Sequence, residues 1–277
     1  MNDPLSRRAF LKAAAYGAGT SFGSAAYGRA ELQWLEMKET DFFLPRWTHE
    51  AFRVAFFADS HLTEQAAVSN AQKAVQWALK QNPNMILFGG DFIEDIKHGV
   101  DHYMEPAFGA IKNCGIPAFA VLGNHDYGSA DPEKVIWKAE QLGFNVLRNQ
   151  AVMVQGVTLV GLDSRSFNYT QPEVMDQYRN EHNVICMVHE PDVALEVQPD
   201  TCSIMLAGHS HGGQVCLPFG IPIHTPLYAK VYKVGYYPEA PNPLFVTRGL
   251  GATGVHVRTF CRPQAHILHL RRIFKVL

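Results

Sequence analysis

The sequence predicts an α/β fold, and three observations lead to this prediction. From residue 52 onward, short apolar segments alternate with segments of helical periodicity. Apolar residues make up 47% of the 277-residue chain and charged residues 18%, which provides enough apolar material for a large core. No internal repeat or low-complexity linker interrupts the sequence after about residue 45. Because α/β chains of this length commonly fold as one domain, we expect a single domain over residues 31–277.

Six apolar segments in the first three quarters of the chain are typical of strands, since they are short and bounded by polar residues or glycine. They span residues 53–58, 85–89, 118–122, 158–162, 184–188 and 203–207. Two later segments with alternating apolar residues, 243–247 and 265–270, predict further strands. Residues 31–50 lack such a pattern and are expected to form an irregular lead-in that packs on the domain.

Two helices are indicated between these strands. Residues Gln65–Lys80 carry apolar side chains at i, i+3 and i+4 intervals, the stripe of an amphipathic helix that packs on a sheet. Asp131 followed by Pro132 is typical of a helix start, and Gly143 is typical of its end. After residue 208, glycine and proline become frequent, so strands joined by long loops are expected there.

The N-terminus has the composition of a targeting segment. Residues 6–12 read Ser-Arg-Arg-Ala-Phe-Leu-Lys and precede a weakly apolar stretch, 13–27, that is too short to span a bilayer securely. This pattern resembles the twin-arginine export signal. We therefore expect a signal segment at residues 1–30, the export machinery as a partner, and a location in the periplasm or cell envelope. The sequence leaves open whether the signal is cleaved, near Ala26 or Ala30, or is retained as a membrane anchor.

Charge and cysteine content exclude other classes. The formal net charge of -2 implies no nucleic-acid-binding surface. Five cysteines without CxxC spacing lie in or beside apolar segments and are expected to be buried thiols. A protein that folds before export does not depend on disulfides formed outside the cytoplasm, so both expectations agree.

Five of the predicted strands end in residues that commonly ligate metals. Ligand sites in α/β sheets lie beyond the carboxyl ends of the strands, so these residues are expected to meet in one crevice. A single Asp or His in this place is often a cap or turn residue, but packing gives no reason for five in series. The five clusters are Asp59-Ser60-His61, Gly90-Asp91, Asn124-His125-Asp126, His189 and His209-Ser210-His211.

The donor atoms in these clusters are imidazole nitrogen, carboxylate oxygen and amide oxygen, without thiolate. Such sites suit Mn, Fe, Zn or similar divalent ions. Seven ligands exceed the needs of one tetrahedral zinc, whereas two ions about 3.5 to 4 Å apart that share a carboxylate would use them all. Two divalent metal ions are therefore expected.

In sequence order, Asp-x-His, Gly-Asp, Gly-Asn-His-Asp, His and Gly-His-x-His resemble the calcineurin-like metallophosphoesterase family over residues 52–215. The extended block 208–214, the segment 247–251 and the arginine signal are similar to its exported bacterial phosphodiesterase branch. The resemblance implies two mixed β-sheets in a sandwich flanked by helices. It also implies that phosphodiester bonds are hydrolysed by a metal-bridging hydroxide, without a covalent enzyme intermediate.

The resemblance also implies a role for each residue of the five clusters. His125 would be the catalytic histidine that protonates the leaving oxygen, and Asp126 would orient it. Asp91 would bridge the two ions. One ion would be held by Asp59, His61 and His211, and the other by Asn124, His189 and His209.

Several alternatives remain at this point. The substrate is either a phosphodiester or a lipid-linked phosphate, as for a UDP-2,3-diacylglucosamine-type lipid pyrophosphatase of the lipid A pathway. The apolar loop 217–228 covers the cleft, contacts a lipid as part of a membrane association, or simply packs on the surface. Arg248 and Arg258 contact a substrate phosphate or are solvated. Eight further histidines, including His224, lack ligand spacing and are interpreted as surface or packing residues.

Two rival classes are less consistent with the residues. A non-catalytic, metal-stabilised envelope binding protein would not need His125 and Asp126 beside the ligand Asn124. The segment 208–212 has the letters of a Gly-x-Ser-x-Gly nucleophile elbow, but Gly213 and Pro218 leave no room for the helix that such an elbow opens. The His-x-His-x-Asp-His pattern of metallo-β-lactamases is absent around His61.

Overall fold

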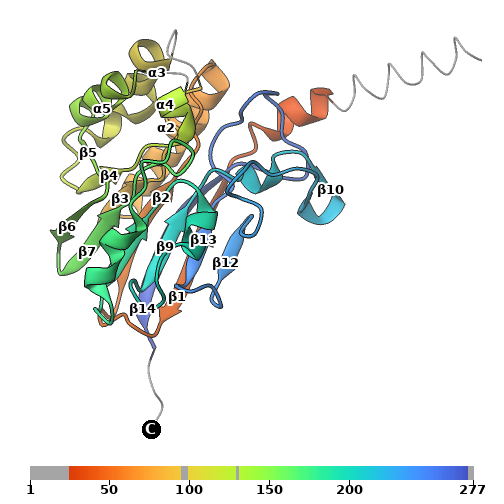
Figure 1. The fold of residues 1–277 in the computed structure, drawn as a ribbon. Helices are drawn as coiled ribbons and strands as arrows, with labels where there is room; N and C mark the ends of the chain where they lie inside the picture. Colours follow the sequence, from red (N-terminus) through yellow and green to blue (C-terminus); the bar gives the residue numbers. More distant parts are fainter. Residues whose placement is uncertain (1–24, 95–98, 129–130, 274–277) are drawn as a thin grey trace, which may run out of the picture.

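The computed structural model describes residues 25–94, 99–128 and 131–273. In this part of the chain, two six-stranded mixed sheets pack face to face, with helices on the outer face of the first (Figure 1). The predicted α/β sandwich is confirmed. The Arg-Arg motif of the expected export signal lies outside the described residues.

The first sheet has the order β1-β14-β2-β3-β4-β5. Its pairs are parallel except for β14 and β2, which run antiparallel. Its short parallel strands alternate with helices along the chain, and the last strand of the chain, β14, inserts between β1 and β2. The bounds are β1 (Glu36–Leu44), β2 (Phe52–Phe57), β3 (Met85–Phe88), β4 (Ala118–Ala120), β5 (Phe144–Val146) and β14 (Gln264–Arg272).

The second sheet has the order β12-β13-β9-β8-β7-β6, with parallel pairing from β13 to β7 and antiparallel strands at both edges. A separate hairpin, β10 (Cys216–Leu217) with β11 (Ile221–Pro222), follows β9. Predicted and observed strand ends differ by at most two residues. The bounds are β6 (Gln150–Val154), β7 (Val157–Gly161), β8 (Val184–Met187), β9 (Ile204–Ala207), β12 (Gly235–Tyr237) and β13 (Leu244–Val246).

The core lies in layers because alternate residues of each strand point to opposite faces. In β2, Val54 and Phe56 pack against the second sheet, whereas Ala55 and Phe57 pack under the helices. The outer face of the second sheet is covered by 3-10 turns rather than long helices. These turns include η2 (Pro172–Tyr178) and η3 (Pro191–Leu195).

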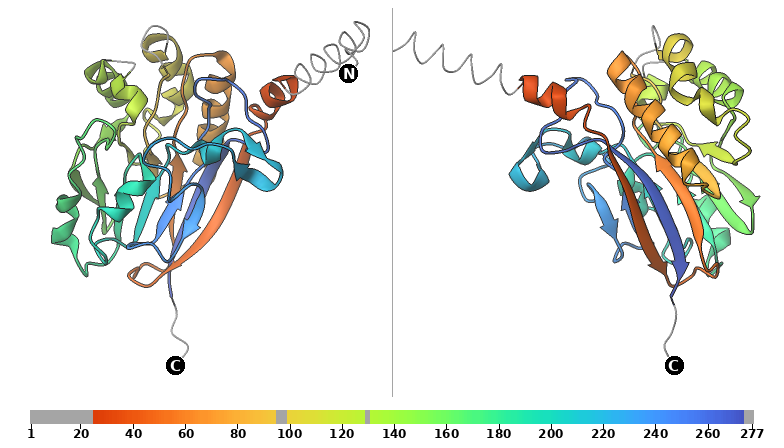
Figure 2. Two further views of the ribbon diagram at one scale, coloured as in Figure 1. Left: turned by 45° about the vertical axis from the view of Figure 1, so that its right-hand side comes forward. Right: turned by 180° about the vertical axis from the view of Figure 1, so that it is seen from behind.

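Helices α2 (Gln65–Lys80), α3 (Gly99–Phe108) and α5 (Pro132–Gln141) lie against the outer face of the first sheet (Figure 2). The apolar stripe of α2 is buried, as its periodicity predicts. The helix at 132 begins as expected, because the Asp131 side chain accepts a hydrogen bond from the backbone of Glu133. Among the described residues, no helix combines the length and apolar content needed to cross a bilayer.

The expectation of an irregular lead-in at residues 31–50 is wrong. Residues Glu36–Leu44 form the edge strand β1, parallel to β14, and bury Phe42 and Leu44. The local sequence did not indicate this strand because its partner lies more than 200 residues away.

The chain before β1 is attached to the domain through the same loop. Residues 25–31 are helical, and the carbonyl of Gly28 accepts a hydrogen bond from the backbone of Arg258. The buried carboxylate of Glu31 accepts hydrogen bonds from the backbone of Phe260 and Cys261. All five cysteines are free thiols; Cys114 is half-buried and the others are buried.

Candidate metal centre

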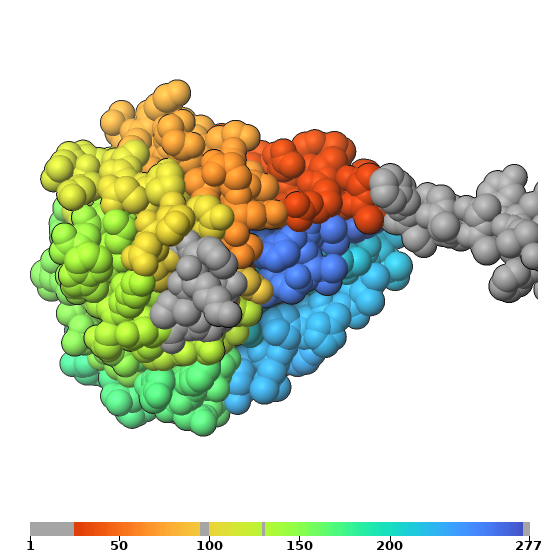
Figure 3. Space-filling model, turned by 90° about the horizontal axis from the view of Figure 1, so that it is seen from above, coloured from red at the N-terminus to blue at the C-terminus, as the bar shows by residue number. Residues whose placement is uncertain are grey.

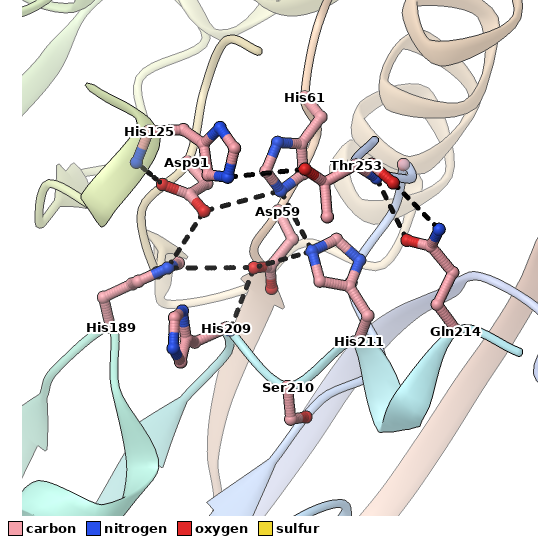
Figure 4. A network of polar contacts seen from close by, with 12 residues as sticks. Asp59, His61, Asp91, His125, His189, His209, Ser210, His211, Gln214 and Thr253 are labelled. Carbon is pink, nitrogen blue, oxygen red and sulfur yellow. Dashed lines mark hydrogen bonds and ion pairs between the residues drawn. The ribbon is translucent and has the colours of Figure 1, made fainter. Parts of the chain in front are cut away.

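The five polar clusters of the sequence meet at one place. They follow the carboxyl ends of β2, β3 and β4 in the first sheet and of β8 and β9 in the second (Figure 4). Of the seven predicted ligands, only Asn124 is half-exposed. The others, Asp59, His61, Asp91, His189, His209 and His211, are buried.

The backbone is strained at this site. Of the seven predicted ligands, all of them described, five have a positive φ between 41° and 65°. A non-glycine residue in this region costs of order 1–3 kcal/mol and usually persists only where function requires it. The strained residues are Asp59, His61, Asp91, His209 and His211.

Two glycines allow the clusters to approach. A Cβ atom on Gly123 would lie 2.2 Å from Oδ1 of Asp91, and one on Gly208 would lie 2.4 Å from Oδ2 of Asp59. Both distances are far shorter than any side chain tolerates, so neither position admits another residue. The glycines that precede Asn124 and His209 are therefore required by the crowding of the site.

The first group of donors consists of Asp59, His61 and His211, as the family resemblance implies. One ligand atom from each lies within 4.8 Å of the others. Nε2 of His211 lies 3.6 Å from Oδ1 of Asp59 and 2.9 Å from Nε2 of His61. Three donors thus point to one small volume.

The second group consists of Asp91, His189 and His209, with the same 4.8 Å limit. Oδ2 of Asp91 lies 3.1 Å from Nε2 of His189 and 3.4 Å from Nε2 of His61. The Asp91 carboxylate therefore stands between the two groups, in the position of a bridge. Asn124 directs a buried oxygen, Oδ1, that has no hydrogen-bond partner in the described residues.

Hydrogen bonds on the far side of the rings prepare three imidazoles for ligation. Nδ1 of His189 donates to the carbonyl of Gly89 at 2.7 Å, and Nε2 of His209 donates to the carbonyl of Leu227 at 2.7 Å. Nδ1 of His61 contacts the Glu94 carboxylate at 2.6 Å. In the neutral tautomer that each bond favours, the other ring nitrogen carries no proton and can bind a cation.

Unpaired polar atoms indicate that a cation belongs here. Within the described residues, Oδ2 of Asp59 and Oδ1 of Asn124 are buried and lack a hydrogen-bond partner. Each such atom costs about 1–3 kcal/mol. Two divalent ions, one at each donor group, would satisfy both atoms, so the residues present fit the expected metals.

Burial and neighbouring charges shift the pKa values of the clustered side chains. Burial raises the pKa of Asp59 to about 6, and the neighbouring Asp91 carboxylate adds to this effect. Burial lowers the pKa of His209 to about 4, and the charge of His189 contributes. Despite their burial, Asp91 and His189 favour each other's charged forms, so that the pKa of Asp91 lies well below and that of His189 well above its ordinary value. A metal cation would offset the cost of burying the Asp59 charge.

His125 opens α4 (Asn124–Gly128) and lies at the edge of a cavity of about 320 Å³. Its backbone N–H donates to Oδ1 of Asp91 at 2.7 Å, and its Nδ1 lies 3.4 Å from Oε2 of Glu94. Nε2 lies 3.3 Å from Oγ1 of Thr253. The ring is thus held beside the metal cluster with one edge toward the cavity.

Asp126 does not orient the His125 ring, contrary to expectation. Its buried carboxylate accepts backbone hydrogen bonds from Asp91, Phe92 and Gly123 at 2.9 Å each. These bonds tie the loop after β3 to the loop after β4. The physical reason is geometric: the helix that starts at Asn124 turns the Asp126 side chain inward, away from the cavity.

Three further residues support the cluster, and sequence reasoning did not identify them in these roles. Glu94 and Thr253 contact His125, and Glu94 also accepts hydrogen bonds from Thr253 and Gly254. Arg258, which was expected to contact a substrate phosphate or to be solvated, is fully buried beneath His211. In the sequence, Glu94 could have been identified because it lies three residues after Asp91, whereas no sequence pattern indicated the role of Arg258.

The cavity also includes a histidine that was interpreted as a surface or packing residue. His224 lines it together with Ile223 and Val255. The lining combines the predicted metal ligands with an apolar wall formed by Val215, Ile223, Pro226 and Val255.

Comparisons with known proteins agree with this arrangement. The calcineurin-like phosphoesterase family model matches residues 52–213. The chain is 29% identical to the uncharacterized metallophosphoesterase YkuE of Bacillus subtilis, over 96% of this chain and 98% of that protein. It is 27% identical to the phosphodiesterase YaeI of Escherichia coli, over 96% and 99%.

A further relative is the UDP-2,3-diacylglucosamine pyrophosphatase LpxG of Chlamydia muridarum, 23% identical over 84% of this chain and 88% of that protein. The match to the family model covers more than half of the chain and includes all five clusters. The chain therefore belongs to the calcineurin-like phosphoesterase family and is a hydrolase that acts on phosphoric ester bonds.

Proposed function

We propose that this chain is a binuclear metal-dependent phosphodiesterase. The observation that carries the proposal is the position of the Asp91 carboxylate, within 3.4 Å of a histidine from each of the two donor groups. A single-metal site would not need a buried carboxylate shared between two sets of ligands. Asp59, His61 and His211 would hold one ion, and Asn124, His189 and His209 the other.

When bound, two divalent ions would neutralise the anionic phosphodiester and lower the pKa of a water molecule. The chain contributes position and proton transfer. The Glu94 carboxylate, 3.4 Å from Nδ1 of His125, orients the ring, and the imidazolium form of this ring would donate a proton from Nε2 to the leaving oxygen. The apolar wall of the cavity excludes water from one side of the substrate, which strengthens these charge interactions.

Two observations bear on the substrate. Similarity to YaeI, which is named a phosphodiesterase, supports phosphodiesters. Similarity to LpxG and the apolar cavity wall, which includes Ile223 and Val255, support a second candidate, a lipid-linked pyrophosphate. Both substrates need the same metal centre and differ only in what occupies the apolar wall.

The test is hydrolysis of bis(p-nitrophenyl) phosphate by the full chain, after chelation and resupply of Mn, Zn, Fe, Ni or Mg. His125→Ala is compared with His182→Ala, an exposed residue just before β8. We expect metal-restored turnover that His125→Ala lowers by about 10²–10⁴-fold while metal content is retained. Equal turnover of the two variants would contradict a catalytic His125.

Absence of hydrolysis with every metal would instead direct attention to the lipid candidate. The same proteins would then be assayed with a UDP-diacylglucosamine lipid. If neither substrate is cleaved although two equivalents of metal bind, the non-catalytic binding protein becomes the better description.

We also propose export by the twin-arginine route to the periplasm or cell envelope. The support is the arginine pair at residues 7 and 8 with its Phe-Leu-Lys continuation. Replacing both arginines by lysine should leave the protein in the cytoplasmic fraction. An unchanged distribution between fractions would contradict this route.

A further inference from the structure

Apolar side chains are concentrated on the surface around the β10–β11 hairpin. Phe219, at its tip, is fully exposed, and the other apolar side chains of the cluster are between 38% and 66% exposed. A cluster of this kind on a folded domain usually marks a contact surface. We call it the apolar rim, and its members are Tyr27, Trp34, Leu217, Phe219, Ile221, Ile223, Leu227 and Phe260.

The rim is continuous from the hairpin to the start of the described chain. A Cβ atom on Gly220 would lie 3.6 Å from the carbonyl oxygen of Phe260. The ring of Phe260 lies 6.1 Å from that of Tyr27, which lies 5.8 Å from that of Trp34. The hairpin, the loop before β14 and the N-terminal helix accordingly occupy one end of the molecule (Figure 3).

The backbone holds Phe219 outward. Its φ is 69°, a conformation that is unfavourable for a bulky residue, and it follows Pro218 in a 3-10 turn. The hairpin is tied to the domain by a hydrogen bond from the backbone of Cys216 to Thr259 at 2.9 Å. A strained, anchored turn that presents phenylalanine to solvent has no benefit for the folding of the isolated chain.

Cationic groups border the rim. Lys230 and Lys233 line a shallow hollow with Ile223 and His224. The guanidinium of Arg262 lies 5.3 Å from the ring of Trp34. Apolar and aromatic side chains bordered by lysine and arginine are the combination that binds the interface of anionic lipid bilayers.

We propose that the apolar rim is a membrane-docking surface that inserts Phe219 and its neighbours into an anionic phospholipid bilayer. Ile223 belongs both to the rim and to the wall of the catalytic cavity. Docking therefore places the mouth of the cavity at the level of the lipid headgroups. The proposed docking surface does not depend on the proposed function. Only its consequence, access of the cavity to lipid-borne phosphodiesters, rests on the proposed function.

The first experiment uses the full chain with one tryptophan added, Phe219→Trp or, as the control, Met153→Trp. Met153 is exposed and lies in β6, at the opposite edge of the molecule (Figure 1). Vesicles contain equal parts of phosphatidylglycerol and brominated phosphatidylcholine. We expect these vesicles to quench the added tryptophan at 219 at least twofold more than that at 153. Because residues 1–24 are identical in both proteins, their own lipid contacts cancel.

The second experiment measures the vesicle-bound fraction of a triple variant, Leu217→Ser with Phe219→Ser and Ile221→Ser. Its control is Met153→Ser with Trp137→Ser, two exposed apolar residues far from the rim. We expect the partition coefficient of the triple variant to fall about tenfold or more, while bis(p-nitrophenyl) phosphate hydrolysis is unchanged.

Equal quenching at 219 and 153 overturns the proposal, as does equal partition of the two serine variants. A rim that binds another protein instead of lipid gives this outcome. Failure of the proposed function is distinct, because it appears as loss of hydrolysis in the unsubstituted chain whether or not vesicles bind.

Discussion

The two sides of the metal centre are built differently. On the side formed by residues 52–128, ligands follow regular parallel strands that lie beneath long helices. On the other side, His189 follows β8, and His209 and His211 follow β9, but only short 3-10 turns cover this sheet. The contacts that fix His209 and His211 come from the loops within residues 208–263. Sheet geometry is sufficient to place a ligand at a strand end, whereas a loop must be held by specific buried polar contacts.

The largest effect is expected from the bridge on the strand side. Asp91→Asn removes the charge that both donor groups share but keeps an oxygen to accept from the backbone of His125. We expect hydrolysis to fall by about 10³-fold or more, with loss of at least one metal equivalent. Thermal unfolding in chelator should be unchanged. A variant that retains two equivalents of metal would contradict the bridging role.

The next largest effect is expected from Arg258, whose hydrogen bonds hold the loops on the second side of the site. Arg258 donates to the carbonyl oxygens of Arg248, Gly251 and Cys261, at 2.6 to 3.1 Å. Arg258→Lys leaves several of these acceptors buried and unpaired, so we expect a loss of about 3 kcal/mol in the free energy of unfolding. Urea titration against the exposed control Arg179→Lys measures it. Equal stability of the two variants would mean that the loops keep their conformation without the hydrogen bonds of Arg258.

Glu94 joins the two sides, because it follows β3 and binds the loop at Thr253 and Gly254. Glu94→Gln weakens the contact that orients His61. We expect metal affinity or turnover to fall about 10–100-fold, with the fold intact. Glu140→Gln, on the exposed face of α5, is the matched control. If Glu94→Gln changed neither quantity, His61 would be oriented by the strand end alone.

A smaller effect is expected on the pH dependence of the free energy of unfolding, through His266 in strand β14. Burial lowers the pKa of His266 from its ordinary value near 6.5 to about 3, and the charge of Lys38 contributes. Nε2 of the ring lies 3.0 Å from Oγ1 of Thr247. Its contribution to stability is complete above pH 6.5 and is lost as the pH falls toward 3, since only the unfolded chain binds the proton. Between pH 6.5 and 5 this loss is about 2 kcal/mol.

Urea unfolding of the wild type and of His266→Gln at pH 8 and pH 5 measures this difference. We expect the variant to lose about 2 kcal/mol less than the wild type on acidification. Equal losses of unfolding free energy in the two proteins would show that His266 does not contribute to the pH dependence of stability.

The contrast between the two sides also explains what the sequence predicted. The short strands that end at Asp59, Asp91 and His189 were visible because a local apolar pattern precedes a polar residue. Strand β1 and the supports Glu94 and Arg258 were not, because each acts through contacts with residues distant in the chain. Asp126 was assigned to the wrong neighbour for the same reason: adjacency in sequence does not give the direction of a side chain.

The contacts of the N-terminal helix carry a consequence for maturation. The carbonyl of Gly28 and the carboxylate of Glu31 bind the loop that carries Arg258, which lies beneath His211. A processing protease that cuts after Ala26 would leave both contacts in place, whereas one that cuts after Ala30 would remove the first and create a new ammonium group at the second. If the expected signal is cleaved, the position of the cut would decide whether the enzyme keeps these contacts behind His211.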